Sequence, residues 1–130
     1  MAKLCDEGEN RILNILFGSQ AVDGTLYLGL YTDSTEPAET ATIASLSEVS
    51  GSGYARKTLT RGSWSVVADA ASYAAQTFTA SGSWGTVYGY FICTSADDSG
   101  KLLFVENFTN GPYTMSTNDA VTVTPSVSAS

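Results

Sequence analysis

Carboxylates are the residues of this chain whose chemistry and spacing first suggest a catalytic or metal site. Asp97 and Asp98 are adjacent, and Glu106 lies inside an apolar run. Adjacent residues on a strand point to opposite faces, and Ser-Gly follows the two aspartates, so we interpret this pair as part of a turn. A carboxylate among apolar neighbours needs a partner such as Arg56 or Arg61, or it must lie where the strand leaves the core. We therefore interpret Glu106 as half of a structural salt bridge rather than as a catalytic acid.

The chain contains no histidine, which is the usual general base near neutral pH and the commonest metal ligand. This excludes Ser-His-Asp and Cys-His catalysis and most zinc sites. Two carboxylates could hydrolyse a glycoside, but nothing selects a pair from the thirteen acidic residues. We expect no enzyme, no catalytic residues, no metal site and no cofactor.

Positive charge is concentrated in one short segment. Arg56, Lys57 and Arg61 supply half of the six basic residues. Two interpretations remain open, which are neutralisation of neighbouring acidic residues and contact with an acidic partner surface.

Aromatic side chains are the second candidate set for recognition. They could line a sugar-binding face, form the centre of a protein interface or fill the core, and the sequence does not decide among these uses. The residues are Tyr27, Tyr31, Tyr54, Trp64, Tyr73, Trp84, Tyr88, Tyr90 and Tyr113.

Length and net charge limit the number of domains and the classes of partner that this protein can have. The 130 residues suit a single domain spanning the whole chain, and the net charge of −7 disfavours nucleic-acid and anionic-membrane partners. No apolar run approaches the roughly 20 residues of a membrane span, and the N-terminal segment does not resemble a signal peptide. Cys5 and Cys93 are expected to be free thiols, because two cysteines do not make a disulfide scaffold.

A short helix is predicted within residues 1–18. Asp6 and Glu9 have the spacing of a capping box, and Gly18 is a typical C-terminal stop. Ile12, Ile15 and Leu16 form one apolar stripe. This stripe is predicted either to pack on the core or to dock on a neighbouring molecule.

Residues 24–128 show alternation with a period of two and predict strands. A strand is expected around Leu26, Leu28 and Leu30, and a long central strand is expected over 84–94. Further strands are expected over 54–60, 63–67 and 76–80, and after a hairpin turn at 97–100. Valines at 121, 123 and 127 predict a closing strand, whereas 33–42 reads as a loop. We expect a mainly β fold, an antiparallel sandwich of jelly-roll or immunoglobulin-like type with one N-terminal helix.

Three segments carry a family resemblance that extends from the helix to Val127. These are 26–32 (LYLGLYT), 53–61 (GYARKTLTR) and 87–92 (VYGYFI). They resemble strand and turn patterns of small virion structural proteins of tailed bacteriophages. The resemblance implies a β-sandwich that decorates or cements a capsid, or else belongs to the tail or head–tail region. It supplies no catalytic residues.

The resulting functional hypothesis is a virion structural protein made in the host bacterial cytoplasm. We expect a capsid decoration protein, assembled as a homotrimer, whose partners are the major capsid protein and copies of itself. A tail or head–tail component, with tail proteins as partners, is the alternative, and a carbohydrate-binding module is the alternative of another class. Six residues are candidate contacts with a protein partner, namely Ile12, Ile15, Leu16, Arg56, Lys57 and Arg61.

Overall fold

A computed structural model describes residues 2–128 and shows a mainly β protein with one N-terminal helix, as predicted. The elements in chain order are β1 (Lys3–Leu4), α1 (Asp6–Phe17), β2 (Thr25–Tyr31), the single 3₁₀ turn η1 (Ile43–Ser45), β3 (Lys57–Thr60), β4 (Ser65–Val67), β5 (Ala70–Ser72), β6 (Gln76–Thr79), β7 (Gly85–Val87), β8 (Gly89–Cys93), β9 (Leu102–Asn107), β10 (Tyr113–Met115), β11 (Ala120–Val123) and β12 (Ser126–Ser128).

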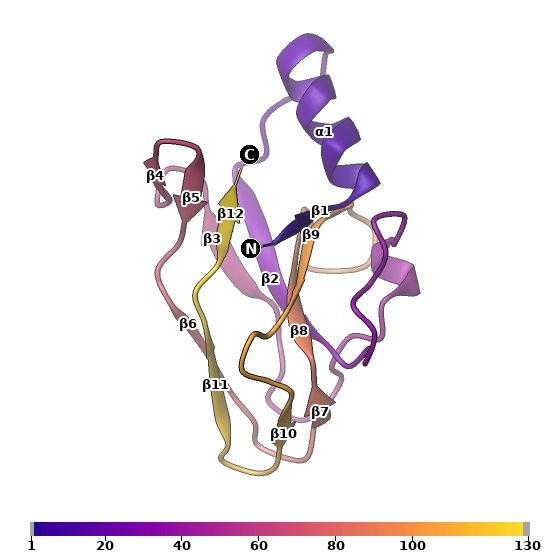
Figure 1. Ribbon diagram of the computed structural model, residues 1–130, viewed down its shortest axis with the longest axis vertical. Coiled ribbons are helices and arrows are strands. Elements are labelled where there is room, and N and C mark those ends of the chain that lie inside the picture. The colour runs from indigo at the N-terminus through magenta and orange to yellow at the C-terminus, as the bar shows by residue number, and fades with distance from the viewer. Residues whose placement is uncertain (1, 129–130) are drawn as a thin grey trace.

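The strands form one larger sheet and three small ones, and all of their pairings are antiparallel. The larger sheet has the order β1-β9-β8-β2-β3. The small sheets are β12-β5-β4, β11-β6 and β10-β7, and they lie along one side of the larger sheet (Figure 1).

Strand β8 lies in the middle of the larger sheet, and all five of its residues are buried. Alternation sends Tyr90 and Ile92 to a core shared with the small sheets, where Phe78 and Val121 also lie. Phe91 faces the opposite way, into a second core. The prediction of a central strand that is apolar on both faces is confirmed.

The second core is covered by the segment between β2 and β3 and by the start of α1. Ile43 of η1 and Cys5 pack there with Phe91 and Cys93 of β8. Both cysteines are buried free thiols, as predicted. Burial raises the pKa of the Cys5 thiol to about 11.

Some predicted boundaries differ from the structure. The strand predicted over 84–94 is divided at Tyr88 into β7 and β8, which belong to different sheets. The strand predicted over 54–60 begins only at Lys57, and Pro125 separates β11 from β12. A jelly-roll or immunoglobulin-like sandwich is not confirmed, because the strands opposite the larger sheet are divided among three separate sheets.

The predicted turn at 97–100 is confirmed between the antiparallel strands β8 and β9. The Asp97 carboxylate accepts hydrogen bonds from the backbone and the hydroxyl of Ser99. These bonds lower the pKa of Asp97. In the part of the chain that the structure describes, no helix is long and apolar enough to cross a membrane.

Candidate docking surface

Helix α1 begins differently from the sequence prediction. Its N-cap is Cys5, which makes no side-chain cap hydrogen bond, so the capping box between Asp6 and Glu9 is wrong. Both acids instead lie in the first turn, where the helix dipole favours negative charge. The predicted end is confirmed, because the Gly18 backbone N–H donates to the carbonyl of Asn14.

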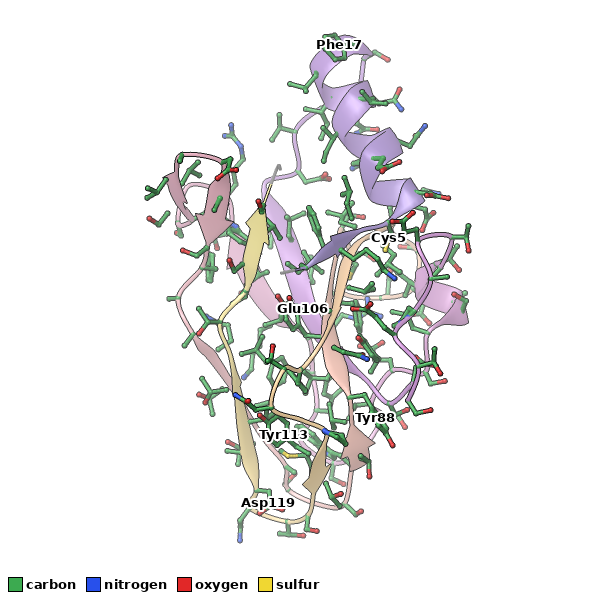
Figure 2. All side chains as sticks on the ribbon, in the orientation of Figure 1. Cys5, Phe17, Tyr88, Glu106, Tyr113 and Asp119 are labelled. Atoms are coloured by element: carbon green, nitrogen blue, oxygen red, sulfur yellow. The ribbon has the colours of Figure 1, made fainter. Side chains whose placement is uncertain are left out.

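The base of the helix is fixed to the larger sheet. The Cys5 backbone N–H donates to the Leu103 carbonyl of β9 at 2.8 Å. Gly8 is buried so closely against this strand that an added Cβ would lie 2.5 Å from the same carbonyl oxygen. The other end of α1 extends past the sheet, with Phe17 at its tip (Figures 1 and 2). The helix is therefore anchored at one end and exposed at the other.

Exposed apolar side chains gather at this end of the molecule. Figure 1 shows α1 and the β4–β5 hairpin at the same end of the molecule, with β12 and the segment after α1 drawn between them. Of the eight large hydrophobic residues exposed within 2–128, Tyr113 alone lies outside these two projections and the segment after α1. We name the other seven the apolar end, and they are Ile12, Leu13, Leu16, Phe17, Val22, Val66 and Val67.

A groove of about 270 Å³ runs beneath α1. Ile12 and Ile15 line it from the helix, and Leu26 and Trp64 line it from the sheet side. The guanidinium-bearing Arg61 is exposed and also lines this groove. The structure thus brings the predicted apolar stripe and one residue of the predicted basic segment to the same site.

An ion pair closes one side of the groove. Arg11 Nε of α1 donates to Asp23 Oδ2 at 3.0 Å, and a second guanidinium nitrogen contacts the other carboxylate oxygen. The hydrogen bond to Asp23 raises the pKa of Arg11. This bidentate pair joins the helix to the segment that enters β2, and both residues line the groove.

A second hollow, of about 470 Å³, lies between α1 and the β4–β5 hairpin. Ile12 and Val66 both line it, together with Leu4, Phe104 and Val127. Because Ile12 also lines the groove beneath the helix, the two hollows form one apolar surface around α1.

Arg56 lies inside the protein and does not join this surface. Its side chain is only 4% exposed. The guanidinium donates to both oxygens of Glu48, at 2.8 and 2.6 Å, and to Asp98 at 2.8 Å. It also donates to the carbonyl of Ser95 and stacks over the ring of Phe91. Together with a hydrogen bond to the Asp97 carbonyl, these internal contacts occupy all five N–H groups of the Arg56 guanidinium.

The two other basic residues of this segment have different neighbours. Lys57 Nζ lies 5.4 Å from the ring centroid of Phe78, which belongs to the core shared with the small sheets. Arg61 lies in the turn after β3 and lines the groove. Of the three residues of the basic segment, only Arg61 lines the groove beneath α1.

The acidic residues that the sequence suggested as catalytic or metal-binding candidates have other roles or arrangements in the structure. Glu106 accepts a hydrogen bond from the Tyr90 hydroxyl at 2.8 Å, whereas sequence reasoning named Arg56 or Arg61 as its partner. Burial raises the pKa of Tyr90, and the contact with Glu106 raises it further. Across residues 2–128, no cluster of three acidic or cysteine ligands is placed to hold a metal ion.

Of the nine aromatic candidates, only Tyr113 is exposed, and the others are buried or half-buried. Trp84 is 6% exposed, and its indole N–H donates to the Ser52 carbonyl. Tyr54 packs edge-on against Trp84, and Trp64 packs against Tyr73. Phe17, which flanks the predicted stripe, has the most exposed ring of the described residues.

Comparison with known families gives the decisive observation. Residues 3–127 match the model of the family described as Podophage GP4 fiber I protein gp80. The chain belongs to this family. No curated protein matches it. The fiber protein is therefore a structural component of a phage virion and not an enzyme, as the sequence predicted. The family description names a fiber protein, which favours the tail or head–tail alternative over capsid decoration.

Proposed function

We propose that this fiber protein is a tail component that attaches to a neighbouring tail protein through α1 at the apolar end. The observation that carries the proposal is the exposed outer half of the helix. Leu13, Leu16 and Phe17 are 56%, 66% and 83% exposed, although they are among the most apolar residues of the chain. Exposed apolar patches of this kind mark protein interaction sites.

Burial of these side chains would supply a sufficient driving force. A fully buried Leu or Phe contributes roughly 1.5–3 kcal/mol, so covering the exposed parts of three such residues gains about 3–6 kcal/mol. Repeated copies on one particle would add avidity to each contact. The groove lined by Ile12, Ile15 and Arg61 adds a recess and one positive charge to the same surface.

Anchoring at the base makes the helix suitable for docking. The contact of Gly8 with β9 and the ion pair of Arg11 with Asp23 hold α1 in one orientation. A partner therefore does not need to order the helix, which reduces the entropic cost of binding. The homotrimer and the capsid partner expected from the resemblance play no part in this proposal.

Incorporation into particles tests the proposal. Leu16→Asp combined with Phe17→Asp removes the exposed apolar tip, and Tyr113→Asp is the matched control because Tyr113 is exposed far from α1 (Figure 2). Phage propagated with each variant would be purified, and the fiber protein counted by quantitative mass spectrometry. We expect the double variant to be lost from particles and the control to be retained, with melting temperatures close to that of the wild type.

Electron microscopy of the same particles locates the wild-type protein. Density at the tail supports the proposal, and density spread over the capsid surface refutes it. Normal incorporation of a folded Leu16→Asp, Phe17→Asp variant would show that α1 is not the attachment site.

A further inference from the structure

The groove beneath α1 combines apolar walls with an unpaired positive charge. All six basic residues of the chain lie within the described range 2–128. Four of them form ion pairs with acidic side chains, and these are Lys3, Arg11, Arg56 and Lys101. Lys57 lies over the ring of Phe78. Arg61 has neither an ion pair nor a ring contact within this range, and it is exposed at the groove.

The fold fixes the backbone of Arg61 and leaves its guanidinium available. The Arg61 backbone N–H donates to the Gly24 carbonyl at 3.0 Å, which ties the turn after β3 to the start of β2. Gly62 follows with a φ of +92°, a left-handed conformation that favours glycine. The Ser63 backbone N–H closes the turn by donating to the Thr60 carbonyl at 3.2 Å. A partner therefore orders only the Arg61 side chain, which limits the entropic cost of the contact.

Trp64 supplies a second group for recognition at the groove. Its ring is half-buried, lines the groove and packs against Tyr73, with 5.2 Å between the ring centroids. The Tyr73 hydroxyl accepts a hydrogen bond from the Thr60 backbone N–H. In the part of the chain that the structure describes, the indole N–H of Trp64 makes no hydrogen bond, whereas that of Trp84 donates to the Ser52 carbonyl. Trp and Arg are enriched among the residues that dominate binding energy at protein interfaces.

The groove has room for one large apolar side chain. Its volume is about 270 Å³, and an apolar cavity of roughly 150 Å³ already accepts a benzene ring. Pockets that bind whole small molecules are larger, about 300–1,000 Å³. Two other charged residues line the groove, Arg11 and Asp23, and they neutralise each other in their ion pair. The recess therefore suits an apolar side chain, and Arg61 suits an anionic group beside it.

We infer that the groove binds a segment of the neighbouring tail protein in which a large apolar side chain stands next to an aspartate or glutamate. The apolar side chain enters the recess, and the carboxylate accepts hydrogen bonds from the Arg61 guanidinium, which matches a carboxylate in a bidentate geometry. The net charge of −7 repels a polyanion such as nucleic acid, whereas a single carboxylate needs only the local charge of Arg61. This inference rests on the proposed function and specifies the chemistry of the partner.

Cross-linking in assembled particles identifies the occupant of the groove. Val22 lines the groove and is 52% exposed, so the photo-reactive residue p-benzoylphenylalanine in its place reports on what binds there. The same residue in place of Tyr113, which is exposed outside the groove, is the matched control. We expect only the Val22 variant to cross-link to another tail protein, at a segment where an acidic residue adjoins a large apolar one. A cross-link to a second copy of this chain, or to a segment without a carboxylate, would overturn the inference.

The cross-linked segment, prepared as a synthetic peptide, is then titrated into the purified full chain. We expect Arg61→Ala to weaken binding about tenfold, the scale of a hydrogen bond to a charged group. Replacement of the peptide carboxylate by an amide should cause the same loss, and both changes together should cause no further loss, because they remove one interaction. Thr109→Glu, at an exposed residue outside the groove, changes the net charge by the same amount as Arg61→Ala and should leave binding unchanged. Additive losses, an unchanged affinity of Arg61→Ala or a peptide that does not bind would contradict the inference.

Particle incorporation separates failure of this inference from failure of the proposed function. We expect Arg61→Glu to be depleted from particles, as the Leu16→Asp, Phe17→Asp variant is. Normal incorporation of Arg61→Glu together with loss of the double variant would overturn the groove contact alone and leave α1 as the attachment site. Normal incorporation of the folded double variant would overturn the proposed function and this inference with it.

Discussion

Replacement of Arg56 by alanine is the substitution whose consequence the structure defines most fully. The Arg56 side chain is 4% exposed and forms a bidentate pair with Glu48. It also joins Asp98 and the carbonyl of Ser95 in the connection between β8 and β9. Removal of the guanidinium would leave the Glu48 carboxylate and the Ser95 carbonyl without this donor. The turn after β8 would lose its attachment to the segment before β3.

The magnitude follows from the solvation of these groups. Removal of one partner from a buried ion pair costs about 3–5 kcal/mol. The Glu48 side chain is 23% exposed and also accepts a hydrogen bond from the Tyr54 hydroxyl, so water and Tyr54 offset part of the loss. We expect Arg56→Ala to lower the free energy of unfolding by about 3 kcal/mol, a large share of the roughly 5–15 kcal/mol that stabilises a protein domain.

Urea denaturation followed by tryptophan fluorescence measures this loss. Arg61→Ala is the matched control, because Arg61 is exposed and the change should stay within about 0.5 kcal/mol. Arg56→Lys should recover only part of the stability, since an ammonium group cannot reproduce the bidentate geometry. If Arg56→Ala proved as stable as Arg61→Ala, the assignment of Arg56 to the fold would be wrong, and a role in partner contact would have to be considered again.

Two further predictions concern the base of α1. Gly8→Ala would gain about 1 kcal/mol of helix propensity, but its Cβ would lie 2.5 Å from the Leu103 carbonyl oxygen, so we expect a lower melting temperature. Gly24→Ala is the control and should leave the melting temperature unchanged, because an added Cβ there meets nothing within 4 Å. A Gly8→Ala protein that melts at a higher temperature than the wild type would contradict this packing. The second concerns Cys5, whose pKa burial raises from 9.0 to about 11. A raised folded-state pKa means that this contribution to stability is complete below pH 9 and declines as the pH rises toward about 11. Between pH 9 and about 11, the urea midpoint should fall more steeply for the wild type than for Cys5→Ala. An equal fall of the midpoint in both proteins would show that the pKa of Cys5 is not raised in the folded state.

The sequence determined features that depend on local pattern. Alternation around Leu28 and Leu30 predicted a strand with a buried face, and both side chains are fully buried. Apolar residues on both faces of 84–94 predicted a central strand, because only a strand covered on two sides keeps both sets from water, and β8 within this range is fully buried. The Asp-Asp-Ser-Gly turn and the helix end at Gly18 follow from equally local chemistry.

The site was predictable only in part. The stripe of Ile12, Ile15 and Leu16 was identified from helical spacing, but its exposure depends on how far α1 extends past β9, which no local pattern records. Arg56 and Arg61 have the same side chain and lie five positions apart. One is buried against Glu48 and the other lines the groove, because β3 between them separates two environments of the fold.

Sequence alone thus predicted a mainly β protein with a short helix and free thiols, since periodicity and residue type act over a few positions. Tertiary structure decided that the strands opposite the larger sheet form three separate sheets, that Arg56 is internal, and that α1 and β4 project from the same end. These outcomes depend on contacts between residues that are distant in the chain. The spacing of residues along the sequence does not reveal such contacts.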